Sequence, residues 1–180
     1  MKTQTAAAAA ALTVFASAAL VSAALVSPAE AAEIAIVHAG KLLAVPGKPT
    51  ANTQTIIIRD GRIERVVAGY LDAAAAGAGD DDTVTLHDLK TMFVMPGFID
   101  GHVHILSETN PRGRLQRVEM SEADSAIAGA GFARKTLMAG FTTVRDVGAG
   151  SSDAIFALRD GIARGDVVGP RIFAAGAIIS

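Results

Sequence analysis

The sequence contains no cysteine and no tryptophan among its 180 residues, and only one tyrosine. The absence of cysteine excludes disulfides, thiolate metal ligands and a cysteine nucleophile, so any metal must be held by nitrogen and oxygen ligands. Charged residues make up 19% of the chain, and the formal net charge is -2. Since no dense basic surface is available to neutralise phosphates, we expect no nucleic-acid partner.

The first 31 residues are typical of an export signal. Lys2 gives the positive start, an apolar stretch runs from about Ala6 to Val26, and an A-x-A site predicts cleavage just before Ala32. The stretch is almost long enough to cross a bilayer, so an uncleaved anchor is the alternative. Its many small residues favour cleavage. We therefore expect a periplasmic or secreted protein with no stable membrane anchor after cleavage.

Short β-branched segments occupy residues 32–95. Asp60-Gly61 separates two of them, Thr55–Arg59 and Arg62–Val67, and a D-G pair in this setting predicts a tight hairpin. An acidic triplet at residues 80–82 lacks the regular spacing of a calcium-binding loop, so we interpret it as solvated surface. The segment therefore predicts a small β-rich unit.

The run P-G-F-I-D-G-H-V-H, which begins at Pro96, combines a strand pattern with metal-binding side chains. Side chains alternate along a strand, so we expect Asp100, His102 and His104 to share one face. Two imidazoles at positions i and i+2 can converge on one cation, although an ordinary strand with two structural histidines remains the alternative. His38 and His87, the two other histidines, lack such a neighbour and are interpreted as structural or surface residues.

This run resembles the first barrel strand of the amidohydrolase superfamily, whose members carry a P-G-hydrophobic-I-D-x-H-x-H motif. The resemblance implies an α/β fold in which a small β-sandwich, here residues 32–95, precedes a TIM (β/α)8 barrel. Residues 96–180 would then form the first three strands and two helices of that barrel. The resemblance also implies that the 180 residues are an N-terminal fragment of a longer protein and are inactive alone.

The segments after the motif predict alternating helices and strands. Ser121 is a suitable N-cap with Asp124 at the third helical position, and Gly140 ends the helix, whose buried face is expected to include Ile127. Such alternation requires parallel strands with right-handed crossovers. The expected elements are a helix from Ser121 to Gly140, a strand at Phe141–Arg145, a helix from Ser152 to Gly165 and a strand at Arg171–Ala174.

The second half of the chain carries a further, narrower resemblance. The run from Ala139 through Arg145-Asp146 to Gly169-Pro170 is similar to the imidazolonepropionase-like and Xaa-Pro dipeptidase-like branch of the same superfamily. Candidate substrates within this resemblance are Xaa-Pro dipeptides, N-acyl amino acids, cyclic amides and lactone-like compounds. The sequence does not decide among them, nor does it indicate an oligomeric state.

His102 and His104 are the predicted metal ligands, because they would lie at the C-terminal end of a barrel strand, where enzymes of this fold place reactive groups. We expect one or two divalent ions, zinc first, with manganese, iron and nickel as alternatives. Such an ion lowers the pKa of bound water and polarises a carbonyl, so that hydroxide attacks an amide or related C–N bond. The resemblance implies that the remaining ligands come from later strands, and none is assigned within these residues.

Five other residues are candidates for the site, although none is assigned as catalytic. Asp100 and Asp146 are expected to support the ligands by hydrogen bonds or to face the substrate, with structural pairing as the alternative. Arg112, Arg114 and Arg117 follow the motif in a segment that its Asn-Pro and Arg-Gly pairs predict to be a loop without a helix. They are candidates for clamping a substrate carboxylate, and the alternative is a solvated loop.

The sequence thus predicts a metal-dependent hydrolase that acts on amide or peptide-like C–N bonds of a small-molecule or dipeptide-like substrate. The competing interpretation is a non-catalytic exported binding protein that keeps a vestigial H-x-H metal site.

Overall fold

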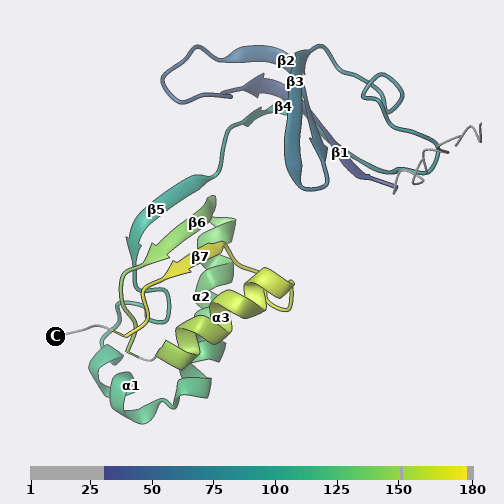
Figure 1. Cartoon of the computed structure of the whole chain (residues 1–180). Coiled ribbons are helices and arrows are strands. Elements are labelled where there is room, and N and C mark those ends of the chain that lie inside the picture. Colours follow the sequence, from purple (N-terminus) through teal and green to yellow (C-terminus); the bar gives the residue numbers. More distant parts are fainter. Residues whose placement is uncertain (1–30, 151, 178–180) are drawn as a thin grey trace, which may run out of the picture.

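The computed structural model describes residues 31–150 and 152–177. The predicted signal peptide, apart from its last residue, lies outside the described residues. No helix within the described ranges is long and apolar enough to cross a membrane. These residues form a four-stranded sheet and, apart from it, a three-stranded sheet with helices (Figure 1).

The N-terminal sheet has the strand order β3-β2-β1-β4, in which β1 pairs parallel to β4 and antiparallel to β2. The predicted hairpin at Asp60-Gly61 is confirmed, with φ angles of 49° and 73° that a tight turn between twisted strands requires. A sandwich needs two packed sheets, and the described part of the chain supplies one here, so the sandwich stays a prediction. The strands are β1 (Glu33–Leu42), β2 (Ala51–Arg59), β3 (Arg62–Ala68) and β4 (Thr83–Val94).

The loop between β3 and β4 covers one face of this sheet. Ile34, Ile36 and Ile57 are buried in a cluster with Ala76 from the loop. His38 is also buried, and its Nε2 lies 2.8 Å from the carbonyl oxygen of Leu71. This contact agrees with the interpretation of His38 as a structural histidine. The loop is therefore an integral part of the fold.

Two residues of the acidic triplet, Asp80 and Asp81, are exposed as predicted, whereas Asp82 is partly buried. The carboxylate of Asp82 accepts hydrogen bonds from the amides of Gly79 and Ala32 and lies 3.5 Å from a guanidinium nitrogen of Arg59. These amides, and then Arg59, hold the pKa of Asp82 below its usual range. Asp82 thus ties the loop to the start of β1.

The C-terminal part alternates strands and helices as predicted, and its three strands are parallel in the order β5-β6-β7. Three strands leave an open sheet, whereas a closed barrel of this type has eight, so the barrel stays an expectation. The strands are β5 (Phe98–Val103), β6 (Phe141–Asp146) and β7 (Arg171–Ala174), and the helices are α1 (Gly113–Glu119), α2 (Glu122–Met138) and α3 (Ser152–Arg164).

One face of this sheet packs against helices and the other is exposed. Val144 and Ile172 are neighbours in register and are buried together with Ala133 of α2 and Leu158 of α3. Phe173, next along β7, is 57% exposed and lies on the opposite face. The hydrophobic core of this part therefore lies between the sheet and the helices.

Helix α2 begins and ends as predicted. Ser121 and Asp124 form a capping box, and Gly140 follows the helix with a φ of 97°. The expected buried face is correct at Ala133, which is fully buried, but wrong at Ile127, which is 75% exposed, and Gly129 is buried as well. A side chain at Gly129 would meet Leu106 and Leu158, so the helix packs through its smallest residues.

The expectation that no helix follows the motif is also wrong, because α1 begins directly after Arg112. The side-chain oxygen of Asn110 accepts a hydrogen bond from the amide of Arg112. The main-chain carbonyl oxygen of Asn110 accepts another from the amide of Gly113. This Asx turn leads the chain into a helical turn, so the residues expected to break a helix instead initiate one.

Candidate metal centre

The histidine motif lies on β5 and just beyond its C-terminal end, and this strand is irregular. Asp100 pairs with Val144 and Val103 with Asp146, so three residue steps of β5 lie opposite two of β6. The strict alternation predicted for the motif is interrupted at this point. Such bulges redirect side chains, and they are common next to functional sites.

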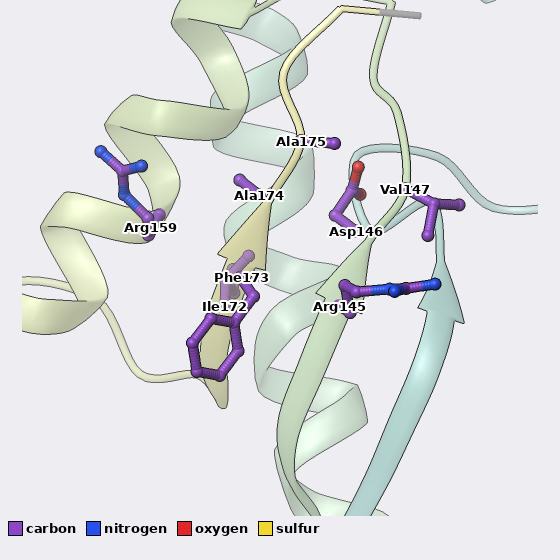
Figure 2. A pocket seen from close by; sticks show the side chains of 8 residues that line it. All are labelled: Arg145, Asp146, Val147, Arg159, Ile172, Phe173, Ala174 and Ala175. Carbon is purple, nitrogen blue, oxygen red and sulfur yellow. The ribbon is translucent and has the colours of Figure 1, made fainter.

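Two hydrogen bonds stabilise the irregular part of β5. Arg145 donates from Nε to the carbonyl oxygen of Gly101 at 2.9 Å, and the side chain extends from β6 toward β5 in Figure 2. The carboxylate of Asp100 accepts from the amide of His102, also at 2.9 Å. Asp100 thus acts on the main chain of the motif and not on an imidazole ring.

The structure brings the rings of His102 and His104 together. Their centroids lie 5.6 Å apart with an interplanar angle of 80°, and both residues are exposed. Because a Zn–N bond is about 2 Å long and half an imidazole adds about 1 Å, two rings that share one cation have centroids within roughly 6 Å. The observed separation meets this limit.

A carbonyl group fixes the tautomer of His104. Its Nδ1 lies 2.6 Å from the carbonyl oxygen of Gly148. Since a carbonyl can only accept, Nδ1 carries the proton, and in the neutral ring Nε2 keeps its lone pair. A histidine whose second nitrogen is engaged in this way is typical of metal sites.

Asp146, the last residue of β6, is fully buried. Its Oδ2 accepts a hydrogen bond from the amide of Ile105 at 2.8 Å, and its Oδ1 accepts one from the amide of Gly148 at 3.0 Å. The carboxylate thus joins the loop after β5 to the loop after β6 and makes its bonds with the main chain.

A cavity of about 720 Å³ opens beside His104, and Asp146 and two residues of α2, Glu122 and Ser125, also line it. Neither Arg112 nor Arg114 lines it. Arg112 is exposed and pairs with Glu119 at 3.2 Å, and Arg114 lines a neighbouring cavity of about 300 Å³. The side chain of Arg117 is not among the described ones. Arg112 and Arg114 are therefore not brought to the histidine pair.

A further cavity of about 440 Å³ lies at the C-terminal ends of β6 and β7, and Figure 2 shows its lining. Arg145 and Phe173 are register neighbours on the face away from the helices. Arg159 contributes from α3 and pairs with Asp160 at 2.7 Å. Among the residues that line this cavity, the guanidinium of Arg145 is the basic group contributed by a strand.

The described residues supply two candidate metal ligands and not a complete set. Within residues 31–150 and 152–177, no three His, Cys, Asp or Glu side chains gather closely enough to hold a metal ion. A catalytic zinc site usually has three protein ligands and an open position. His102 and His104 fit part of such a set, because both are exposed and His104 has the suitable tautomer.

The sequence does not reveal the carbonyl groups that support the site. The carbonyl oxygens of Gly101 and Gly148 accept the bonds from Arg145 and His104. Every residue has a main-chain carbonyl group, so residue type does not identify the one that accepts a hydrogen bond. The one available signal is the presence of glycine at these positions. Gly148 has a φ of 152°, which glycine adopts more readily than other residues.

Comparison with known proteins finds similarity over the region that carries the histidine pair. The model of the Amidohydrolase family matches residues 93–180. Adenine deaminase 2 from Carboxydothermus hydrogenoformans is 41% identical over 78 residues, which are 43% of this chain and 10% of that protein.

Two solved structures extend the similarity to most of the chain. A Xaa-Pro dipeptidase with methionine bound in its active site is 32% identical over 82% of this chain, with a TM-score of 0.68. A prolidase in complex with N-methylphosphonate-L-proline is 29% identical over 79% of it, with a TM-score of 0.64. This chain spans about a third of each structure, 34% and 32% respectively.

Proposed function

Because the chain belongs to the amidohydrolase superfamily, we propose that it contributes two metal ligands to a hydrolase that cleaves C–N bonds. His102 and His104 are the proposed ligands, and zinc is the first candidate ion. A divalent ion held there supplies a Lewis acid that activates water and polarises the substrate carbonyl. The role of the chain's own residues is to bind and orient that ion.

The hydrogen bond from Nδ1 of His104 to Gly148 is the observation that carries this proposal. It directs the proton to Nδ1, so that Nε2 is available on an exposed ring. His102 adds a second exposed imidazole at a distance that suits a shared cation. Asp100 and Arg145 support the main chain of the motif by hydrogen bonds at His102 and Gly101.

We propose a dipeptide-like substrate that contains a peptide or amide bond. The support comes from the structures similar to this chain, which are a Xaa-Pro dipeptidase and a prolidase. The adenine deaminase relative also has a name that denotes chemistry at a C–N bond. No observation on the described residues favours the non-catalytic alternative.

The test is an assay of the protein expressed from its complete gene, stripped of metal and reloaded with zinc. The substrate panel contains Xaa-Pro dipeptides, N-acyl amino acids and cyclic amides. We expect metal-dependent hydrolysis of at least one Xaa-Pro dipeptide and loss of that activity in His102→Ala and His104→Ala. His87→Ala is the matched control, because His87 is exposed on β4 in the other sheet, and it should keep full activity.

Two results would contradict the proposal. One is hydrolysis that survives in either ligand variant. The other is a metal-loaded protein that hydrolyses none of the three substrate classes.

Export to the periplasm or the exterior is a separate proposal, supported by the apolar segment in the first 31 residues. Sequencing the N-terminus of protein recovered from the source cells tests it. We expect a mature N-terminus near Ala32, and recovery of a chain that still begins at Met1 would contradict cleavage.

A further inference from the structure

We propose that Asp146 is a positioning residue that holds His104 in its metal-binding orientation through two main-chain amides. This inference rests on the proposed function, because it assumes that His104 binds the metal. It assigns a role to a buried carboxylate that hydrogen-bonds to main-chain amides and lines the same cavity as His104.

The contacts of Asp146 converge on His104 from two sides. One carboxylate oxygen accepts from the amide of Ile105, the residue that directly follows His104. The other accepts from the amide of Gly148, whose carbonyl oxygen in turn lies 2.6 Å from Nδ1 of His104. A single side chain therefore fixes both the main chain next to the ligand and the group that orients its ring.

The energetics of this carboxylate favour a positioning role over a purely stabilising one. Asp146 is fully buried, and no lysine or arginine pairs with it among the described residues. Burying an unpaired charge costs free energy, even when amides donate to it. A buried apolar side chain such as the neighbouring Val144 avoids this cost. The carboxylate is thus explained by the two acceptors that it offers.

The amides of Ile105 and Gly148 are two donors, and they require two acceptor oxygens on the side chain at position 146. Aspartate supplies both. Both oxygens of an aspartate accept, whereas asparagine offers one oxygen and one NH2 group. In Asp146→Asn, that NH2 group would face the amide of Ile105 or of Gly148, and one of these two bonds would be lost. Loss of the bond to Ile105 loosens the segment that carries His104. Loss of the bond to Gly148 loosens the segment that orients the His104 ring.

The conformation of Gly148 completes this arrangement. Gly148 has a φ of 152°, and in this conformation its carbonyl oxygen lies near Nδ1 of His104 while its amide donates to Asp146. A side chain at this position would favour a different φ. Gly148→Ala therefore perturbs the same connection without changing the carboxylate.

The test measures zinc affinity and not only activity, in the protein expressed from its complete gene. Affinity is determined by competition with a chromophoric chelator, and the visible spectrum of the cobalt-substituted protein reports the ligand geometry. We expect Asp146→Asn to bind zinc about 10-fold to 100-fold more weakly and to change the cobalt spectrum. Gly148→Ala should show the same two effects.

Val144→Ala is the matched control, because Val144 is fully buried on the same strand and makes none of these hydrogen bonds through its side chain. It should lower the stability of the metal-free protein and leave zinc affinity and the cobalt spectrum unchanged. If Val144→Ala weakens zinc binding as much as Asp146→Asn does, Asp146 is merely structural and the inference is overturned.

The inference and the proposed function fail in different ways. If Asp146→Asn fails to fold, Gly148→Ala decides, and unchanged affinity in that variant overturns the inference. If His104→Ala loses zinc while Asp146→Asn keeps wild-type affinity, only this inference fails. If His104→Ala binds zinc as tightly as wild type, the proposed function itself fails.

Discussion

Gly97 lies directly before β5, where the chain passes close to β6, and replacing it by alanine should destabilise the sheet that carries the histidines. A Cβ atom at this position would lie 2.7 Å from the Cβ of Thr142 and would also meet both of its γ atoms. Rotation about χ1 of Thr142 moves the γ atoms but not the Cβ. One of the two strands must therefore shift.

Overpacking of this kind costs about 1–3 kcal/mol, and we expect Gly97→Ala to lose that much free energy of unfolding. The assay is urea unfolding of a double-mutant cycle with Thr142→Gly, which removes every atom involved in the clash. Thr142 is exposed, so its own replacement should cost no more than about 1 kcal/mol, mainly through lower strand propensity. In the Thr142→Gly background, Gly97→Ala should cost at least about 1 kcal/mol less.

A second glycine of the same stretch is the matched control. A Cβ at Gly101 would meet no atom within 4 Å, so Gly101→Ala should change stability by no more than about 0.5 kcal/mol. The steric argument is refuted if Gly97→Ala costs the same in both Thr142 backgrounds. It is also refuted if Gly97→Ala is as well tolerated as Gly101→Ala.

Three further predictions concern stability and are checked by urea unfolding. Ser121→Ala removes the side-chain cap of α2 and should cost about 1 kcal/mol. Leu158→Ala leaves a cavity between α3 and the sheet and should cost about 2–5 kcal/mol, so a loss below 1 kcal/mol would contradict this core. The pKa of Asp82 is lowered in the folded state, so its contribution is present above the unfolded value of about 3.9 and is lost as the pH falls through the folded value. Asp82→Asn should therefore be less stable than wild type at pH 7 and equal to it at the lowest pH, and a constant difference would contradict the assignment.

Local sequence signals are sufficient for most of the secondary structure. Asp60-Gly61 identifies the hairpin because both positions need a positive φ. Ser121 and Asp124 identify the start of α2 because their side chains cap it. These interactions span only a few residues, so the sequence contains all the information that they require.

Packing between distant segments is less predictable. Periodicity assigns Ile127 to the buried face of α2, but the helix contacts Leu106 and Leu158 at Gly129. Hydrophobicity does not identify a glycine as a contact residue, since its role is to let the backbone approach. The start of α1 was missed because Asn110 initiates the helix from outside it.

In the candidate site, too, the local features could be predicted from the sequence, whereas those that depend on distant residues could not. The spacing of His102 and His104 is a local feature, and it correctly brings the two rings together. The irregular register of β5 and the acceptor role of Gly148 depend on β6 and the loop after it. Their partners lie more than 40 residues away in the sequence, so no local pattern could have identified them.

The most direct test of the central claim is anomalous diffraction from crystals of the zinc-loaded protein expressed from its complete gene. The account predicts a zinc peak within bonding distance of both His102 and His104, with Nε2 of His104 as the ligand and its Nδ1 still bonded to Gly148. A peak coordinated by neither ring, or one coordinated through Nδ1 of His104, would contradict it.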